Sequence, residues 1–182
     1  CVMDAAAEIE EGSIVTAMTR NGRDFGIRIS GLGKRWFTAD VNTPVGLFFT
    51  GYTQDDANPD IGDSAITETF GVGGAAMVAA PGVTRFVGAG GFQDALRISN
   101  EMQEIYVDNN PLLLIPSWDF RGAPLGLDIR KVVETGITPL INTGIAHKLP
   151  GIGQVGAGTV RAPLDCFVAA FEALAQKLEL ND

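Results

Sequence analysis

The dipeptide Asn21-Gly22 constrains the fold of this chain more than any other feature of its sequence. Asn-Gly between two alternating segments is the strongest short signal for a β-hairpin, and here segments 14–20 and 23–29 flank it. A two-residue turn places Arg20 opposite Arg23 and puts five apolar side chains on one face of the hairpin. These are Ile14, Met18, Phe25, Ile27 and Ile29. We expect that face to need a partner surface, supplied by a longer protein or by a second copy.

The remaining elements are predicted from hydrophobic periodicity and from glycine and proline. Short strands are expected at 36–38, 47–50 and 84–87, a buried strand at 112–115, and helices at 75–80, 92–109 and 163–178. Pro81-Gly82 is expected to end the first of these helices. Because the strands occur in clusters rather than in strict alternation with helices, we predict an α+β fold. It has mixed, mostly antiparallel strands, an N-terminal β-hairpin and flanking amphipathic helices, in a single domain over residues 1–182.

Charge and cysteine content exclude several classes of function. The formal net charge of −9 disfavours binding to nucleic acid or to an anionic membrane surface. No apolar run approaches the roughly 20 residues that span a bilayer. Two cysteines and one histidine provide neither a disulfide framework nor a structural zinc site. We therefore expect a cytoplasmic protein in a reducing compartment.

The first residues suggest a chain cut from a longer protein. Residue 1 is Cys1, and segment 2–9 is rich in helix formers but has no N-cap residue before its first apolar side chain. We read this segment as the end of a helix whose beginning is missing. An alternative is that Cys1 is an exposed N-terminal nucleophile with its α-amine as the base, as in an amidohydrolase.

An acidic segment followed by glycines is the first candidate for a functional site. Segment 55–74 combines carboxylates, hydroxyls and an amide, and it ends in Gly73-Gly74 before a predicted helix. Its candidate residues are Asn58, Asp60, Asp63, Ser64, Thr67, Glu68 and Thr69. The carboxylates offer ligands for Mg²⁺, and the glycine N–H groups offer donors for an anion. A capped acidic loop and close backbone packing explain the same pattern equally well.

The second candidate site surrounds the single histidine. His147 and Lys148 follow the small polar residues Asn142 and Thr143, and a glycine-rich segment, 151–158, contains Gln154. Histidine transfers protons near neutral pH, and lysine neutralises phosphate or carboxylate. A structural histidine beside a solvated lysine is the alternative. The glycines indicate close approach of a ligand or of another chain segment.

Several long motifs resemble one family. AMTRNGRDFGIRISGLG (17–33), DANPDIGDSAITET (56–69), VVETG (132–136), NTGIAHK (142–148) and GIGQVGAG (151–158) resemble the YlbE/YahG-like family, which includes a subunit of oxamate carbamoyltransferase. The resemblance implies a chain of about twice this length, of which this is the C-terminal half. It also implies partner subunits and a reaction in which oxalurate and phosphate give oxamate and carbamoyl phosphate.

These expectations assign roles to named residues. Proton transfer and carbamoyl transfer are assigned to His147, Lys148, Asp63 and Glu68. The small anionic substrate is assigned to Arg20, Asn21, Arg28, Asn58, Asp60, Ser64, Thr67, Thr69, Gly73, Gly74, Asn142, Thr143 and Gln154. No cofactor is expected, with Mg²⁺ as an alternative. A homo-oligomer, or a hetero-oligomer with partner subunits, is expected, and a noncatalytic scaffold subunit remains the rival function.

Overall fold

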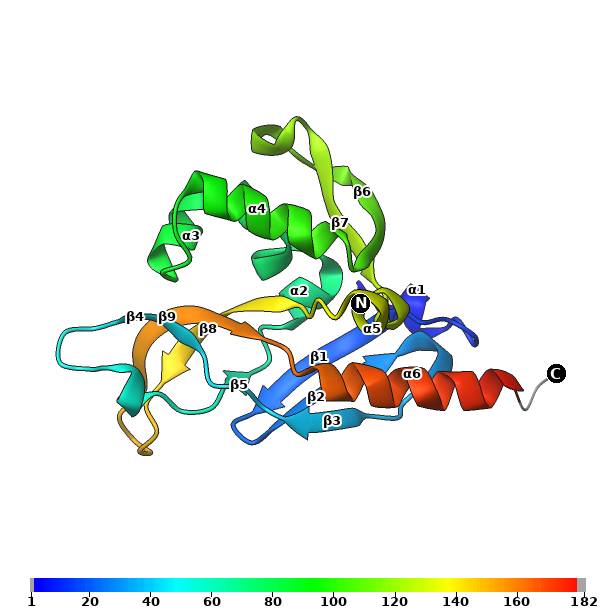
Figure 1. Ribbon diagram of the computed structural model, residues 1–182, viewed down its shortest axis with the longest axis horizontal. Coiled ribbons are helices and arrows are strands. Elements are labelled where there is room, and N and C mark those ends of the chain that lie inside the picture. The colour runs from blue at the N-terminus through cyan, green and yellow to red at the C-terminus, as the bar shows by residue number, and fades with distance from the viewer. Residues whose placement is uncertain (1, 180–182) are drawn as a thin grey trace.

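The computed structural model of the chain describes residues 2–179 and confirms the α+β fold (Figure 1). The helices are α1 (Asp4–Ala7), α2 (Ile66–Phe70), α3 (Pro81–Phe86), α4 (Phe92–Gln103), α5 (Ile129–Thr135) and α6 (Leu164–Glu179). The strands are β1 (Val15–Asn21), β2 (Asp24–Ile29), β3 (Phe37–Asp40), β4 (Val45–Phe48), β5 (Ile61–Gly62), β6 (Tyr106–Ile115), β7 (Arg121–Leu127), β8 (Leu140–Ala146) and β9 (Gln154–Arg161). Short 3-10 helices are η1 (Ser30–Leu32), η2 (Gln54–Asp56), η3 (Gly73–Ala79) and η4 (Pro116–Trp118).

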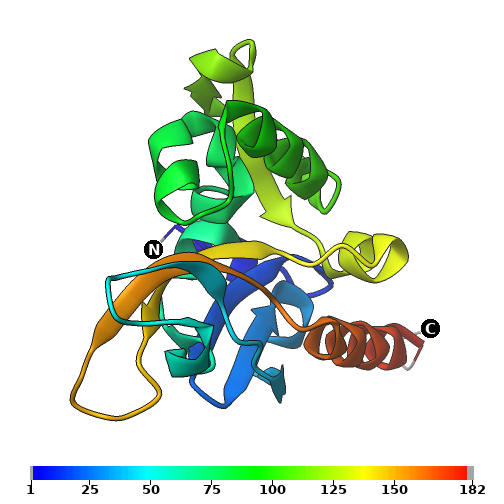
Figure 2. The same cartoon turned by 60° about the vertical axis from the view of Figure 1, so that its left-hand side comes forward.

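The strands form three antiparallel sheets. Their orders are β3-β2-β1-β5, β4-β9-β8 and β6-β7. In two views of the molecule, η3, α3, α4 and the β6–β7 pair form an upper part above the two larger sheets (Figures 1 and 2). Strand β8 lies where these parts meet and packs against η3.

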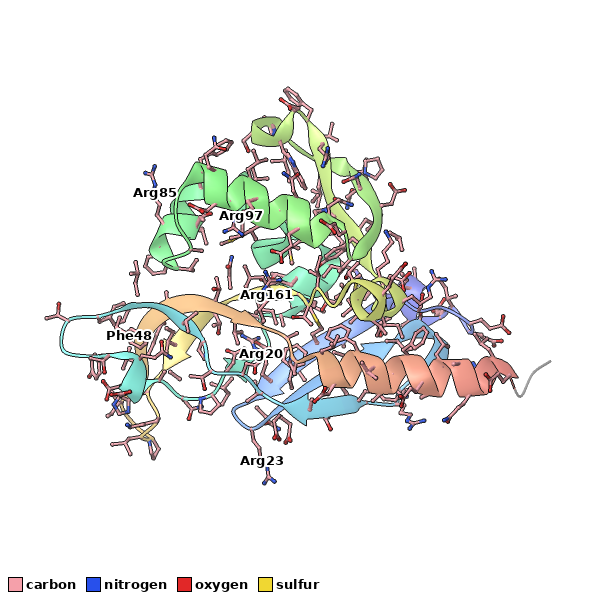
Figure 3. All side chains as sticks on the ribbon, in the orientation of Figure 1. Arg20, Arg23, Phe48, Arg85, Arg97 and Arg161 are labelled. Atoms are coloured by element: carbon pink, nitrogen blue, oxygen red, sulfur yellow. The ribbon has the colours of Figure 1, made fainter. Side chains whose placement is uncertain are left out.

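The predicted hairpin forms and buries Met18, Phe25, Ile27 and Ile29 as predicted, but its register differs by two residues. The prediction for Ile14 is wrong, because a bulge between Val15 and Ala17 leaves Ile14 partly exposed and places Val15 opposite Ile29 in the core. Arg20 pairs with Phe25 rather than with Arg23. The side chain of Asn21 causes the change, because its Oδ1 accepts hydrogen bonds from the N–H groups of Arg23 and Asp24, at 2.9 and 2.7 Å. This widens the turn. The prediction that Arg20 and Arg23 lie opposite each other is therefore wrong. Figure 3 shows Arg20 inside the molecule and Arg23 at its periphery.

The hairpin face is covered by the same chain. Met18, Phe25 and Ile27 are at most 3% exposed, and they belong to one apolar core with Phe167 and Leu174 of α6. Helix α6 packs on β2 and β3. The expected need for an external surface at this face is therefore wrong, because the predicted C-terminal helix supplies that surface.

Three element predictions are also wrong. The 84–87 segment lies largely in α3, which begins at Pro81 because proline suits the first turn of a helix. Helix α4 ends at Gln103, and the rest of the segment predicted as helical belongs mostly to β6. Within β6, Leu112–Leu114 are exposed rather than buried. In addition, the predicted 75–80 helix is the 3-10 helix η3, which is kinked at Ala76.

Glycines explain the pairing of β4 with β9. A Cβ at Gly158 would lie 2.3 Å from the carbonyl oxygen of Val45, and one at Gly156 would lie 2.5 Å from that of Leu47. Real Cβ atoms do not approach so closely, so only glycine permits this contact. The glycine-rich 151–158 segment is thus approached by another segment of the chain.

The structure describes one of the two cysteines, Cys166. Cys1 lies outside the described residues, and so does the N-terminal nucleophile hypothesis. Cys166 is buried in α6, where burial raises the pKa of its thiol to about 12. It is therefore a core side chain and not a reactive thiolate. Among the helices of residues 2–179, none has the length and apolar character needed to cross a membrane.

Candidate functional site

A buried ion pair lies at the centre of the candidate site. Arg20 lies one residue before the end of β1, paired with β5, and its Nε donates to Oδ2 of Asp60 at 2.5 Å. Its Nη2 also donates to Oδ1 of Asp60, at 3.3 Å, and both side chains are fully buried. Such a pair is favourable only when its remaining polar groups are satisfied, because burial removes two charges from water.

Ser64 and Thr143 complete the ion pair. Nη1 of Arg20 donates to the Ser64 hydroxyl at 3.2 Å, and Nη2 donates to the Thr143 hydroxyl at 3.0 Å. Thr143 in turn donates to Asp60 at 2.7 Å. Since Arg20 belongs to the four-stranded sheet and Thr143 to β8, the cluster joins two sheets. Each guanidinium nitrogen of Arg20 is engaged within the chain.

Glu68 forms a second buried cluster beside the first. Its side chain accepts hydrogen bonds from the N–H of Gly74 (2.7 Å), the N–H of Asn142 (3.2 Å) and the hydroxyl of Thr67 (2.8 Å). Glu68 has no exposed surface. Burial raises the pKa of its carboxyl group above the ordinary 4.5, although these hydrogen bonds oppose the shift. Glu68 therefore ties α2 to η3 and β8.

This raised pKa predicts how stability changes with pH. The contribution of Glu68 to folding is fully present below pH 4.5, its ordinary pKa, and is lost as pH rises through the folded pKa. Glu68→Gln stays uncharged, so wild type should lose stability relative to this variant as pH rises from 4 to 7. Urea unfolding of both proteins across that range measures the difference, with the exposed Glu134→Gln as the baseline. A difference between wild type and Glu68→Gln that does not change with pH would contradict the prediction.

Tyr106 also belongs to this cluster and is not among the site residues predicted from the sequence. Its hydroxyl donates to the backbone carbonyl of Glu68 at 2.5 Å, and burial raises the pKa of that hydroxyl well above 10. Tyr106 falls within the helix predicted over 92–109, but it begins β6. A buried tyrosine needs a hydrogen-bond partner, which is the only signal that points to this role.

The glycines after α2 are explained by packing. Gly71 has φ +100°, and a Cβ there would lie 1.7 Å from the carbonyl oxygen of Pro124. A Cβ at Gly73 would lie 2.4 Å from Oε1 of Glu68, and one at Gly74 would lie 2.0 Å from the carbonyl oxygen of Leu140. The N–H of Gly74 is bonded to Glu68. Of the two explanations that the sequence leaves open for this segment, the structure thus supplies direct observations for close packing.

His147 and Lys148 lie at the far end of β8, four residues or more beyond Thr143, which in a strand is about 13 Å. Nδ1 of His147 accepts a hydrogen bond from the N–H of Leu149 at 2.8 Å, and Nε2 lies 3.7 Å from Asp56. Lys148 donates to the carbonyl oxygen of Asp55 at 2.5 Å. Both side chains thus hold the turn after β8 against segment 53–58, and they form a cluster separate from Arg20 and Glu68.

The other candidate residues lie in different surroundings. Arg28 donates to the carbonyl oxygen of Gly33 and lies over Trp36 at the surface. Asn21 forms the hairpin turn, and Gln154 donates to the carbonyl oxygen of Gly156. Further positions are Asn58, which donates to the carbonyl oxygen of Pro59, Thr69, which donates to that of Ala65, and Asp63, which is exposed.

The carboxylates of the acidic segment do not converge on one point. Asp56 accepts hydrogen bonds from Thr53, Asp60 from Arg20, and Glu68 from Gly74. Within residues 2–179, no three carboxylate, histidine or cysteine side chains gather in a way that could hold a metal ion. The arrangement therefore lends no support to the Mg²⁺ alternative.

The clusters leave a small polar surface above them, which we name the 64–142 surface and define as Ser64, Thr67, Gly73 and Asn142. Ser64 and Thr67 are exposed, and Gly73 and Asn142 are partly exposed. Oδ1 of Asn142 is itself covered and has no hydrogen-bond partner among the described residues. Hydroxyl, amide and backbone groups of this kind can bind a small polar molecule.

Comparison with known proteins places this arrangement in a family. The family model described as oxamate carbamoyltransferase subunit AllG matches residues 1–64. Over 179 residues the chain is 75% identical to the oxamate carbamoyltransferase subunit AllG of Escherichia coli K12. The chain belongs to the AllG/YahG family. The family resemblance of the sequence motifs is thereby confirmed.

The other matches agree with this family. The uncharacterised protein YahG of Escherichia coli K12 is 48% identical over 168 residues. A crystal structure of a conserved protein of unknown function from Enterococcus faecalis V583 is 52% identical, with a TM-score of 0.92 over 96% of this chain. The chain spans 43% of AllG, 35% of YahG and 42% of the Enterococcus protein. It therefore accounts for less than half the length of each of these relatives.

Proposed function

We propose that this chain is part of a carbamoyltransferase subunit that acts on oxalurate, oxamate or a related small anionic ureido compound with phosphate, together with partner subunits. The observation that carries the proposal is the 75% identity to AllG across 98% of the chain. In the proposed reaction a phosphate oxygen attacks the carbamoyl carbon of oxalurate, and the C–N bond to oxamate breaks. The products are carbamoyl phosphate and oxamate, whose nitrogen takes up a proton.

We propose that the 64–142 surface contacts the substrate. Ser64 and Thr67 are exposed and carry hydroxyls there. Beneath them, the covered Oδ1 of Asn142 has unused hydrogen-bonding capacity that a small shift of the side chain would make available to a substrate. The surface lacks a free cation, because Arg20 beneath it is engaged on each of its nitrogens. The positive charge that an anionic substrate needs would therefore come from another part of the polypeptide or from a partner subunit. A chain that supplies no cation to the substrate is also compatible with the rival function, a noncatalytic scaffold subunit.

The His147–Lys148 cluster is the alternative location for proton transfer. In favour of it, His147 is an imidazole next to an ammonium group, in a chain of net charge −9. Against it, both ring nitrogens of His147 face groups of the chain. Catalysis by this cluster would require the contact with segment 53–58 to open.

The test is an assay of carbamoyl transfer from carbamoyl phosphate to oxamate, using the full polypeptide and its partner subunits. Thr67→Val should raise the KM for oxamate about tenfold, with a much smaller change in kcat, because it removes one hydrogen bond to substrate. The variant also removes the bond from Thr67 to Glu68, so urea unfolding checks that it stays folded under the assay conditions. Thr50→Val, an exposed threonine on another loop, is the matched control.

Two outcomes would change the proposal. If the complete assembly shows no turnover of oxamate, the proposed activity is wrong. If Thr67→Val behaves like wild type while His147→Gln lowers kcat by about 10²–10⁴-fold, the site belongs to the His147–Lys148 cluster instead. Lys148→Met would then raise KM by weakening anion binding.

A further inference from the structure

The pair of strands β6 and β7 forms an arm with an unusual bulge. Asn109 lies opposite Pro124, but Leu114 lies opposite Gly122, so residues 110–113 of β6 oppose Ala123 alone. The bulge is held from within, since Oδ1 of Asn110 accepts a hydrogen bond from the N–H of Leu112 at 2.9 Å. A Cβ at Gly122 would lie 2.2 Å from the carbonyl oxygen of Asn110. The bulge is therefore a built feature of the arm.

The arm presents large apolar side chains to solvent. Leu112 in the bulge is 88% exposed, Leu114 is 53% exposed, and Phe120 in the connection to β7 is 66% exposed. Phe120 has φ +57° and follows Asp119 at φ +51°, a left-handed conformation that is costly for an aromatic residue. The guanidinium of Arg121 lies over the ring of Trp118, at 4.8 Å, beside this connection. Strained backbone that exposes an aromatic side chain indicates a functional surface.

An apolar groove is lined by the residues that follow the exposed Leu112 in β6. It has a volume of about 240 Å³, and Leu113 and Leu114 form one wall. The η3 residues Gly73, Ala76 and Ala79, with Val72 just before η3, line the groove opposite β6. This space is large enough for one leucine side chain, since a cavity of about 150 Å³ holds a benzene molecule.

A second copy of the chain fits this surface better than an unrelated partner does. A protruding leucine and a groove lie next to one another, so a two-fold axis between them brings each leucine to the groove of the other copy. The distribution of charged residues also favours a second copy. The chain has a net charge of −9, but residues 109–118 carry no charged side chain. Two copies can meet here without placing carboxylates against each other.

We propose that the β6–β7 arm is a homodimerisation surface, in which Leu112 of each copy occupies the groove between β6 and η3 of the other. The bulge positions the leucine, and the strained Phe120 covers the contact from the side. Gly73 of the 64–142 surface also lines this groove, so the two proposed sites are neighbours. The inference does not depend on the proposed catalytic function, because it requires no substrate.

Sedimentation equilibrium of the full polypeptide that carries this sequence tests the proposal. Leu112→Asp should raise the dimer dissociation constant at least about 30-fold, as expected for loss of a central interface side chain. Ala79→Trp, which fills the groove, should have the same effect from the opposite side of the contact. Leu149→Asp is the matched control, because it changes an exposed leucine of the turn between β8 and β9 and should leave the dimer intact.

Leu112 is so exposed that its replacement should not alter folding, so weaker dimerisation of Leu112→Asp can be assigned to the contact itself. Thermal unfolding and circular dichroism check that each variant is folded. A wild-type polypeptide that stays monomeric at 100 μM would overturn the proposal. So would a dimer that persists in folded Leu112→Asp, or an arm that binds a different subunit in place of a second copy.

Discussion

Replacing Arg20 with methionine is expected to lower the free energy of unfolding by about 3–5 kcal/mol. The substitution keeps an unbranched side chain but leaves the carboxylate of Asp60 buried without its cation. Asp60 is 1% exposed, so water cannot replace the lost partner. Thr143 would still donate one hydrogen bond to it, which is too little to compensate a buried charge. Urea unfolding at neutral pH measures the loss.

A second variant separates the ion pair from its packing. Arg20→Met combined with Asp60→Leu should recover most of the lost stability, because apolar residues of similar volume often replace a buried pair at little cost. The hydroxyl of Thr143 can still donate to the carbonyl oxygen of Gly144. Arg97→Met is the control, since its pair with Asp94 is exposed and should be worth less than about 1 kcal/mol. A double variant as unstable as Arg20→Met alone would contradict this explanation.

The hairpin shows what local sequence determines and what it leaves open. Alternation of apolar residues predicts which side chains are buried, because that pattern depends only on the two-residue period of a strand. It does not determine register. Slipping the pairing by two residues keeps the same face, and the choice is made by Asn21, whose side chain bonds to the backbone of Arg23 and Asp24. Such bonds depend on side-chain geometry that residue type alone does not specify.

The candidate site was predictable as a set of segments but not as a network. Short spacing in the sequence groups Asp60, Ser64 and Glu68, and all three do lie in the connected clusters. Asp60 lies 40 residues from Arg20 in the sequence, and Thr143 lies 123 residues from it. These contacts follow from how β5 and β8 meet β1, so tertiary packing decides them. The distance between His147 and Thr143 along β8 likewise depends on 140–146 being one extended strand.

The wrong predictions have a common physical origin. The segments 84–87 and 104–115 were judged by local pattern. Pro81 does end the helical segment before it, as predicted, but a proline can also begin a helix, and α3 starts there. The run Leu112–Leu114 was expected to be buried, because apolar strands usually are. Its exposure is set by the bulge, which depends on Gly122 of the neighbouring strand. Local pattern carries no information on that partner.

Gly71→Ala is expected to destabilise the protein by at least about 4 kcal/mol, the range of exceptional single substitutions. Two causes add. Gly71 ends α2 in the left-handed conformation, which costs other residues about 1–2 kcal/mol. Its Cβ would also lie 1.7 Å from the carbonyl oxygen of Pro124, an atom of the β7 backbone that cannot move aside as a side chain would. Relief therefore requires α2 or β7 to shift, and α2 carries Glu68.

The chain contains a close control for this prediction. Gly136 ends α5 in the same left-handed conformation, with φ +70°, but a Cβ there would meet nothing within 4 Å. Gly136→Ala should therefore lose only the conformational term of about 1–2 kcal/mol. Urea unfolding of both variants isolates the cost of the contact with Pro124 as the difference between them. Equal losses would mean that β7 yields easily at Pro124, and that the contact does not hold α2, and with it Glu68, in place.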